Sequence, residues 1–188
     1  PSVSWVVAPA DYSEHPGPSS PVQGAYYVPK VLEALTSNPD VWSKTALFVT
    51  FDENDGFFDH VPPPCAPSRD DDGPLRGAST VDDTGERLDD TGLNVYGGFP
   101  HGPGVRVPMW VVSPFSRGGF VCSETFDHTS ILRFLENRFG VMEPNITAYR
   151  RAMCGDLCSA FDFLTPNDPS VPTLPMRTQA EADAVRSA

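Results

Sequence analysis

Residues 45–56 read TALFVTFDENDG, and this stretch decides the fold. Its first seven residues are apolar or β-forming and too few for a typical helix, so they predict a buried strand. The strand runs directly into the acidic side chains of Asp52 and Glu53. Because α/β enzymes place their chemistry outside the carboxyl ends of such strands, this junction is the first candidate for a functional site.

Further strands and helices are expected on both sides of this stretch. Ser4–Ala8 and Val107–Ser113 are short apolar runs followed by proline, which predicts two more strands. Val22–Leu35 and Asp127–Phe139 carry apolar residues at helical spacing. We expect Pro29 to set the first turn of the continuous part of the first of these helices. For the second helix, the residue types predict a cap at Asp127 and an end at Gly140.

Strands interleaved with helices indicate an α/β fold built on part of a mostly parallel sheet flanked by helices. Three strands are too few to cover such a sheet, so we expect the domain to be incomplete in this chain. The pattern places one part of a larger sheet domain at residues 1–164, with a long polar insert at about 62–104. Residues 165–188 are rich in proline and then in small polar residues, and are expected to form a loosely ordered tail.

Composition excludes several classes of protein. The chain has 188 residues and a net charge of −12, which argues against a nucleic-acid partner because phosphates would be repelled. No apolar run approaches the roughly 20 residues that a spanning helix needs, so no transmembrane segment is expected. The chain starts at Pro1, without Met or a signal peptide, and is expected to be a processed protein or a fragment.

The acidic side chains after the strand are candidate metal ligands. Adjacent carboxylates repel each other unless a cation neutralises them, so Asp52 and Glu53 point to a hard or borderline metal ion. The alternative is a solvent-exposed acidic turn in which His60 packs against Phe57 and Phe58. An EF-hand is excluded because Gly56 is the fifth residue counted from Asp52, where that loop needs its glycine at the sixth. The acidic runs of the insert, such as residues 70–72, are expected to be solvated loop.

Two histidines are candidates for proton transfer. His15 follows the first expected strand as the acids follow the second, so in a parallel sheet both would leave at the same edge. His60 follows the acidic run closely enough to turn back towards it. His101 is expected at the opposite edge, and His128 beside the helix cap in a structural hydrogen bond. No serine lies in a nucleophile elbow and no phosphate-binding glycine loop is present.

The run TFDENDGFFDHVPPP at residues 50–64 resembles the bacterial phosphoesterase family that holds the non-haemolytic phospholipases C and related acid phosphatases. Further matching stretches follow the same order along the chain: DYSEHPG at 11–17, RVPMWVVSPFSRGG at 106–119, FDHTSILRFLE at 126–136 and RFGVMEPNITAYRRAMCGDLCSAFD at 138–162. Together they cover nearly the whole chain. The amino-terminal metal motif of the family and its nucleophile segment are not among them, so the chain resembles the carboxyl-terminal half of the catalytic domain.

This resemblance implies an alkaline-phosphatase-like fold and one or more divalent metal ions. Asp52 and Glu53 would be metal ligands, His15 and His60 would hold the phosphate or protonate the leaving group, and Asn54 would contact substrate. The nucleophile would come from the missing amino-terminal half of the domain, the partner this chain needs for turnover.

The implied function is that of a secreted or periplasmic, metal-dependent phospholipase C, a phosphoric ester hydrolase that releases diacylglycerol and a head group such as phosphocholine. The partners are then a phospholipid or other phosphate ester and, transiently, a membrane surface. One alternative is an acid phosphatase of the same family acting on monoesters. Another, of a different class, is a non-catalytic calcium-binding or interaction module. Export would also favour a disulfide between Cys122 and Cys154, although Cys158, one turn from Cys154, could be the partner instead.

Overall fold

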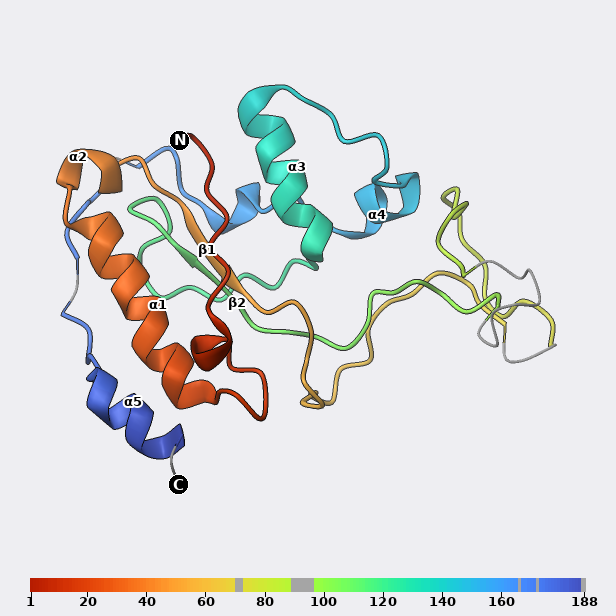
Figure 1. Ribbon diagram of the computed structural model, residues 1–188. Coiled ribbons are helices and arrows are strands. Elements are labelled where there is room, and N and C mark those ends of the chain that lie inside the picture. Colours follow the sequence, from red (N-terminus) through yellow and green to blue (C-terminus); the bar gives the residue numbers. More distant parts are fainter. Residues whose placement is uncertain (70–72, 89–96, 166, 172, 187–188) are drawn as a thin grey trace. The chain divides into compact units, whose positions relative to one another are not determined.

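A computed structural model describes residues 1–69, 73–88, 97–165, 167–171 and 173–186 (Figure 1). The chain divides into two compact units, which are treated separately. Unit 1 comprises Pro1–Leu47, Val112–Arg117 and Thr165–Ala188, and unit 2 comprises Phe48–Val111 and Gly118–Leu164. The fold is mixed α/β, as the sequence predicts.

Unit 1 is built on the helix α1, Pro21–Thr36. Ser20 caps its first turn by accepting a hydrogen bond from Val22 N–H, and Pro21 occupies the first helical position, where a missing N–H is harmless. Pro29 therefore lies inside a continuous helix and does not begin one, which corrects the expectation from the sequence. The 3-10 turn η1, Ala10–Tyr12, contacts α1, with the Tyr12 ring 5.6 Å from that of Tyr26.

Two short helices pack on α1. The helix α2, Pro39–Trp42, follows it directly and is capped by Asn38. The helix α5, Gln179–Arg186, lies beside α1 (Figure 1), where Gln23 Nε2 donates to the carbonyl of the fully buried Ala182. The segment 165–188, expected to be a loosely ordered tail, thus contains a helix that is hydrogen-bonded to α1.

The strand expected at Ser4–Ala8 does not form. This segment is extended chain without strand pairing, and its large side chains are exposed, Trp5 by 68% and Val7 by 89%. An apolar run becomes a strand only where a neighbouring strand satisfies its backbone groups, and the described residues provide none here.

The other two expected strands form and pair with each other. These are β1, Leu47–Thr50, and β2, Met109–Val112. Ser113 Oγ donates to the Thr45 carbonyl at 2.7 Å, and Thr50 Oγ1 lies 3.5 Å from the Pro108 carbonyl. The start of one strand thus faces the end of the other, so the pair is antiparallel and the expectation of parallel strands is corrected. The division between the units falls within this pair, after Leu47 and after Val111.

In unit 2 the helix α3, His128–Phe139, is the longest element and ends as predicted at Gly140, whose φ is +68°. The helix α4, Ala148–Met153, and the 3-10 turn η2, Cys158–Ala160, follow it. Phe48 of β1 meets Phe134 of α3 edge-on at 5.2 Å, and Phe161 stacks on Phe134 at 5.1 Å. The buried side chains of this unit include Ile131, Ile146 and Leu157.

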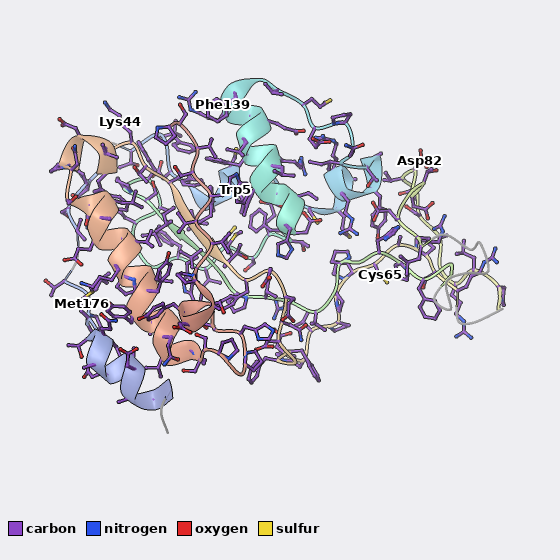
Figure 2. The ribbon with its side chains drawn as sticks, viewed as in Figure 1. Trp5, Lys44, Cys65, Asp82, Phe139 and Met176 are labelled. Atoms are coloured by element: carbon purple, nitrogen blue, oxygen red, sulfur yellow. The ribbon has the colours of Figure 1, made fainter. Side chains whose placement is uncertain are left out.

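The polar insert also belongs to unit 2 and carries the labelled Cys65 and Asp82 (Figure 2). Within it, Leu88 N–H donates to the Phe99 carbonyl and Gly98 N–H donates to the Leu88 carbonyl. Across the described residues, no helix combines the length and the apolar character that crossing a bilayer requires.

Candidate functional site

The acidic residues after β1 form a tight turn, here called the acid loop (Asp52–Phe57). Phe57 N–H donates to the Asn54 carbonyl at 2.8 Å, with Asp55 at φ +51° and Gly56 at φ +80°. Positive φ at both central positions is typical of a type I′ turn, which favours an Asp-Gly pair. The side-chain amide of Asn54 donates to the Phe57 carbonyl at 2.8 Å and reinforces this turn. Gly56 thus turns the chain immediately after the acids.

Asp52 and Glu53 are both exposed at this turn. Asp52 Oδ1 accepts from Glu53 N–H at 3.1 Å, and Glu53 Oε2 accepts from Asp55 N–H at 2.6 Å. These bonds fix both side chains against their own loop. An ionised carboxylate has about four lone-pair sites, so each side chain keeps acceptor capacity for another ligand.

The donor types fit a hard divalent cation, which prefers carboxylate oxygens and takes about six to eight of them. Two adjacent carboxylates supply part of such a sphere. Within the residues that the structure describes, no cluster of three or more His, Cys, Asp or Glu side chains could complete it. The acid loop by itself supplies two adjacent carboxylates, and their role as metal ligands stays a prediction.

His60 lies three residues beyond the acid loop and is exposed. Its neighbour Asp59 pairs with Arg106, whose Nε donates to Asp59 Oδ2 at 2.9 Å, and Asp59 Oδ1 accepts from Val61 N–H at 3.1 Å. The Arg106 guanidinium and the Val61 amide hold the pKa of Asp59 below its usual range. This pair ties the segment around His60 to the residues just before β2.

His15 lies in unit 1, whereas Asp52, Glu53, Asn54 and His60 lie in unit 2. Its ring Nδ1 is 2.8 Å from the Pro16 carbonyl, and its backbone N–H donates to Ser13 Oγ at 3.2 Å. The side chain is exposed. The convergence of His15 with the acid loop stays a prediction.

Sequence reasoning missed a buried ion network at the start of α3. Arg150 of α4 donates from Nε to Glu86 Oε2 at 2.7 Å and from Nη1 to Asp127 Oδ2 at 3.1 Å. The side chains are 15%, 2% and 8% exposed, respectively. Thr147 Oγ1 also donates to Glu86. A cap at Asp127 was readable from the sequence, but no local pattern pairs Glu86 with a residue 64 positions away.

The first residue of α3 reaches the edge of the acid loop. His128 Nε2 lies 2.9 Å from the carbonyl of Phe51, the residue that precedes Asp52. This confirms the structural hydrogen bond expected for His128 and adds its acceptor, which the sequence could not identify.

The acidic runs of the insert are engaged locally where the structure describes them. Asp82 Oδ1 accepts from Thr84 N–H and Oγ1, and Asp83 pairs with Arg87 at 2.8 Å. Residues 70–72 and 89–90, the remaining candidates for a calcium site there, lie outside the described residues.

All four cysteines are free thiols, so the structure does not contain the expected bridge between Cys122 and Cys154. Cys122 is exposed, with Sγ 3.6 Å from Ser159 Oγ. Cys154 is buried at the end of α4, and burial raises the pKa of its thiol to about 11. The two thiols thus occupy different environments, one at the surface and one inside unit 2.

The sequence of this chain matches a family of known proteins. The family model described as the phosphoesterase family matches residues 1–142. The chain is 63% identical over 182 residues to a non-hemolytic phospholipase C of Pseudomonas aeruginosa, covering 97% of the chain and 26% of that protein. It is 58% identical to a non-hemolytic phospholipase C of Burkholderia pseudomallei, covering 93% of the chain and 24% of that protein.

More distant relatives have similar names. A phospholipase C B of Mycobacterium tuberculosis is 46% identical, with 93% of the chain and 32% of that protein covered. The chain spans only about a quarter to a third of the length of these relatives. The match to the family model nevertheless covers most of the chain, and it includes the acid loop. On these grounds, the chain belongs to the phosphoesterase family.

Proposed function

We propose that this chain supplies part of the active site of a metal-dependent phospholipase C. The observation that carries the proposal is the acid loop: two adjacent exposed carboxylates at the end of β1, in a chain 63% identical to a non-hemolytic phospholipase C. The proposal includes an alkaline-phosphatase-like domain, export from the cytoplasm and transient contact with a membrane surface. The nucleophilic hydroxyl comes from a part of the protein outside this chain.

In this proposal the Asp52 and Glu53 carboxylates bind a divalent cation. When bound, such an ion supplies Lewis-acid chemistry, offsetting charge at phosphorus and lowering the pKa of a hydroxyl nucleophile. The turn of the acid loop serves binding because it holds both carboxylates against backbone N–H groups in a fixed orientation. Less reorganisation is then needed when the site fills.

The histidines are proposed to act on the phosphate ester itself. Protonated His60 donates its proton to the leaving alkoxide oxygen and becomes neutral imidazole, and His15 donates a hydrogen bond to a phosphate oxygen. His60 belongs to the same unit as the carboxylates, and the Asp59–Arg106 pair fixes the segment that carries it.

The test is hydrolysis of phosphatidylcholine and of a water-soluble choline phosphodiester by the enzyme that contains this chain. Asp52→Asn and Glu53→Gln should each lower the rate by several orders of magnitude with the fold intact. Asp82→Asn is the matched control, since it removes a carboxylate that is engaged within the insert, and it should leave the rate unchanged.

Three outcomes would contradict the proposal. Near-normal rates for the Asp52 variant would remove that residue from the mechanism. Faster hydrolysis of a simple monoester than of the diester would favour the acid phosphatase. Metal binding that requires Asp82 and not Asp52 would favour a non-catalytic calcium module.

A further inference from the structure

The start of α3 is fixed in position by its own cap. Asp127 Oδ1 accepts from Thr129 N–H at 2.9 Å and from Thr129 Oγ1 at 2.6 Å, while Ser130 Oγ accepts from Asp127 N–H at 3.1 Å. Ser130 is fully buried. This reciprocal capping box satisfies the first N–H groups of the helix and sets the direction in which its first side chain, His128, leaves the backbone.

The same cap is held from the other side by Arg150. Because Asp127 uses Oδ1 for the cap and Oδ2 for Arg150, the carboxylate is engaged on both oxygens. Arg150 is in turn fixed by Glu86, which is 2% exposed. Charge-assisted hydrogen bonds between buried groups are short and directional, so the network resists rotation of the helix end.

From this fixed helix end, His128 reaches the chain that leads into the acid loop. Its Nε2 lies 2.9 Å from the Phe51 carbonyl oxygen, whereas Thr50 Oγ1 lies at 3.4 Å from the same atom. That carbonyl belongs to the planar peptide group whose nitrogen is the backbone nitrogen of Asp52. Holding the carbonyl oxygen therefore restricts the orientation of the peptide on which Asp52 is mounted.

We infer that His128 is a positioning residue, which orients the acid loop through the Phe51 carbonyl and thereby preorganises Asp52 and Glu53. The inference rests on the proposed function, since it assigns His128 a role at the proposed metal site. His128 binds neither metal nor substrate in this scheme. It donates from Nε2–H to a backbone carbonyl, as outer-shell partners of metal sites commonly do to keep the ligands in place.

The first test needs no metal. Amide–water exchange of Glu53 and Asp55, measured by NMR on the full chain, should accelerate in His128→Leu roughly twofold to tenfold, the range expected for losing one net hydrogen bond. His128→Gln should restore the wild-type rates, because its amide N–H ends near the position of Nε2. His101→Leu makes the same change at an exposed histidine of the insert and should leave both rates unchanged.

The second test follows Mn²⁺ on the same proteins through paramagnetic broadening of the amide resonances of residues 52–56. His128→Leu should weaken Mn²⁺ binding roughly tenfold, a typical effect of removing an outer-shell partner. His128→Gln should stay within roughly twofold of the wild type. A merely structural histidine would affect overall stability without this difference between Leu and Gln.

The outcomes separate the inference from the function on which it rests. If Asp52→Asn binds Mn²⁺ like the wild type, the proposed metal site is wrong, whatever His128 does. If Asp52→Asn loses Mn²⁺ but His128→Leu keeps wild-type exchange and affinity, the positioning role is overturned. Should His128→Leu fail to fold by circular dichroism, His128→Asn replaces it: its donor is too short to reach the carbonyl, so it should behave unlike Gln.

Discussion

Glu136 on α3 and Arg151 on α4 face each other through two parallel hydrogen bonds. Arg151 Nη1 donates to Glu136 Oε2 and Nη2 donates to Oε1, both at 2.8 Å. Arg151 also donates to the carbonyls of Ile146 and Glu143, in the connection between the two helices. A bidentate pair of this kind has fixed geometry, so it holds α4 and its connection against α3.

Acid should remove this contact in a defined pH range. Arg151 and the Glu143 N–H hold the pKa of Glu136 at about 2, below its ordinary value of 4.5. The pKa of Glu136 is lower in the folded state than in the unfolded state. The pair therefore stabilises the folded state fully above about pH 4.5, and less as the pH falls towards 2. Glu136→Gln should lower the urea midpoint at pH 7 and lower it much less near pH 2. Glu33→Gln, in an exposed pair with Lys30, is the control; an equal loss for Glu136→Gln at both pH values would contradict this account.

Removing Arg150 should destabilise unit 2 strongly. Arg150→Met leaves Glu86 and Asp127 as buried carboxylates without their cation, a change that costs about 3–5 kcal/mol. Arg138→Met, at an exposed arginine over the Phe139 ring, should stay within about 0.5 kcal/mol of the wild type. Urea unfolding followed by circular dichroism measures both. Similar midpoints for the two variants would show that the network is not buried as described.

Gly140 should be sensitive to substitution for conformational reasons alone. Its φ is +68°, and no atom lies within 4 Å of where a Cβ would be placed. Gly140→Ala should therefore cost about 1 kcal/mol, whereas Gly140→Asn should cost less, since Asn tolerates the left-handed region. Gly104→Ala is the matched control, as that site is equally open and has no such backbone requirement. Equal unfolding free energies for the two alanine variants would refute the prediction.

The two histidines proposed to act in catalysis can be told apart by the leaving group. His60→Ala and His15→Ala should each lower the rate of the enzyme that contains this chain by about 10²–10⁴-fold, because the first removes the proton donor and the second removes a hydrogen bond to the phosphate. A diester with an activated leaving group needs no proton at departure, so it should rescue His60→Ala and not His15→Ala. His101→Ala serves as the control. If both variants keep wild-type rates, these histidines are surface residues without a catalytic role.

The thiols should differ in reactivity. Alkylation by iodoacetamide at pH 8 should modify the exposed Cys65 and Cys122 quickly, because the thiolate is the reactive form and both side chains are accessible. Cys154 should react slowly, since it is buried and its thiol pKa is about 11. Mass spectrometry of the peptides reads out each site. A mass two units low with Cys122 and Cys154 both unreactive would instead restore the disulfide expected from the resemblance.

The sequence alone was sufficient to predict the helices and strands whose positions are decided by residue types and spacing within the element itself. The apolar stripe, the cap and Gly140 predicted α3 nearly to the residue, and β1 and β2 lie within their predicted runs. The turn of the acid loop was readable too, because Gly56 allows the backbone to turn tightly after the acids.

Features that depend on distant partners were not readable. Ser4–Ala8 has a strand's composition but forms none, because pairing needs a neighbour that composition does not supply. The direction of pairing between β1 and β2 also lay outside any local pattern. Glu86 gave no sign that it would be buried, since its environment is created by Arg150, far along the chain.

The hydrogen bonds between Leu88 and residues 98–99 have a consequence for protein engineering. Leu88 N–H bonds to the Phe99 carbonyl and Gly98 N–H bonds to the Leu88 carbonyl, while Glu86, two residues before Leu88, pairs with Arg150. An epitope or a fluorescent reporter grafted at residues 86–88 or 98–99 would break these bonds and separate Glu86 from Arg150, so Asp127 at the start of α3 would lose the arginine that both carboxylates share. Tags are therefore better kept away from these residues.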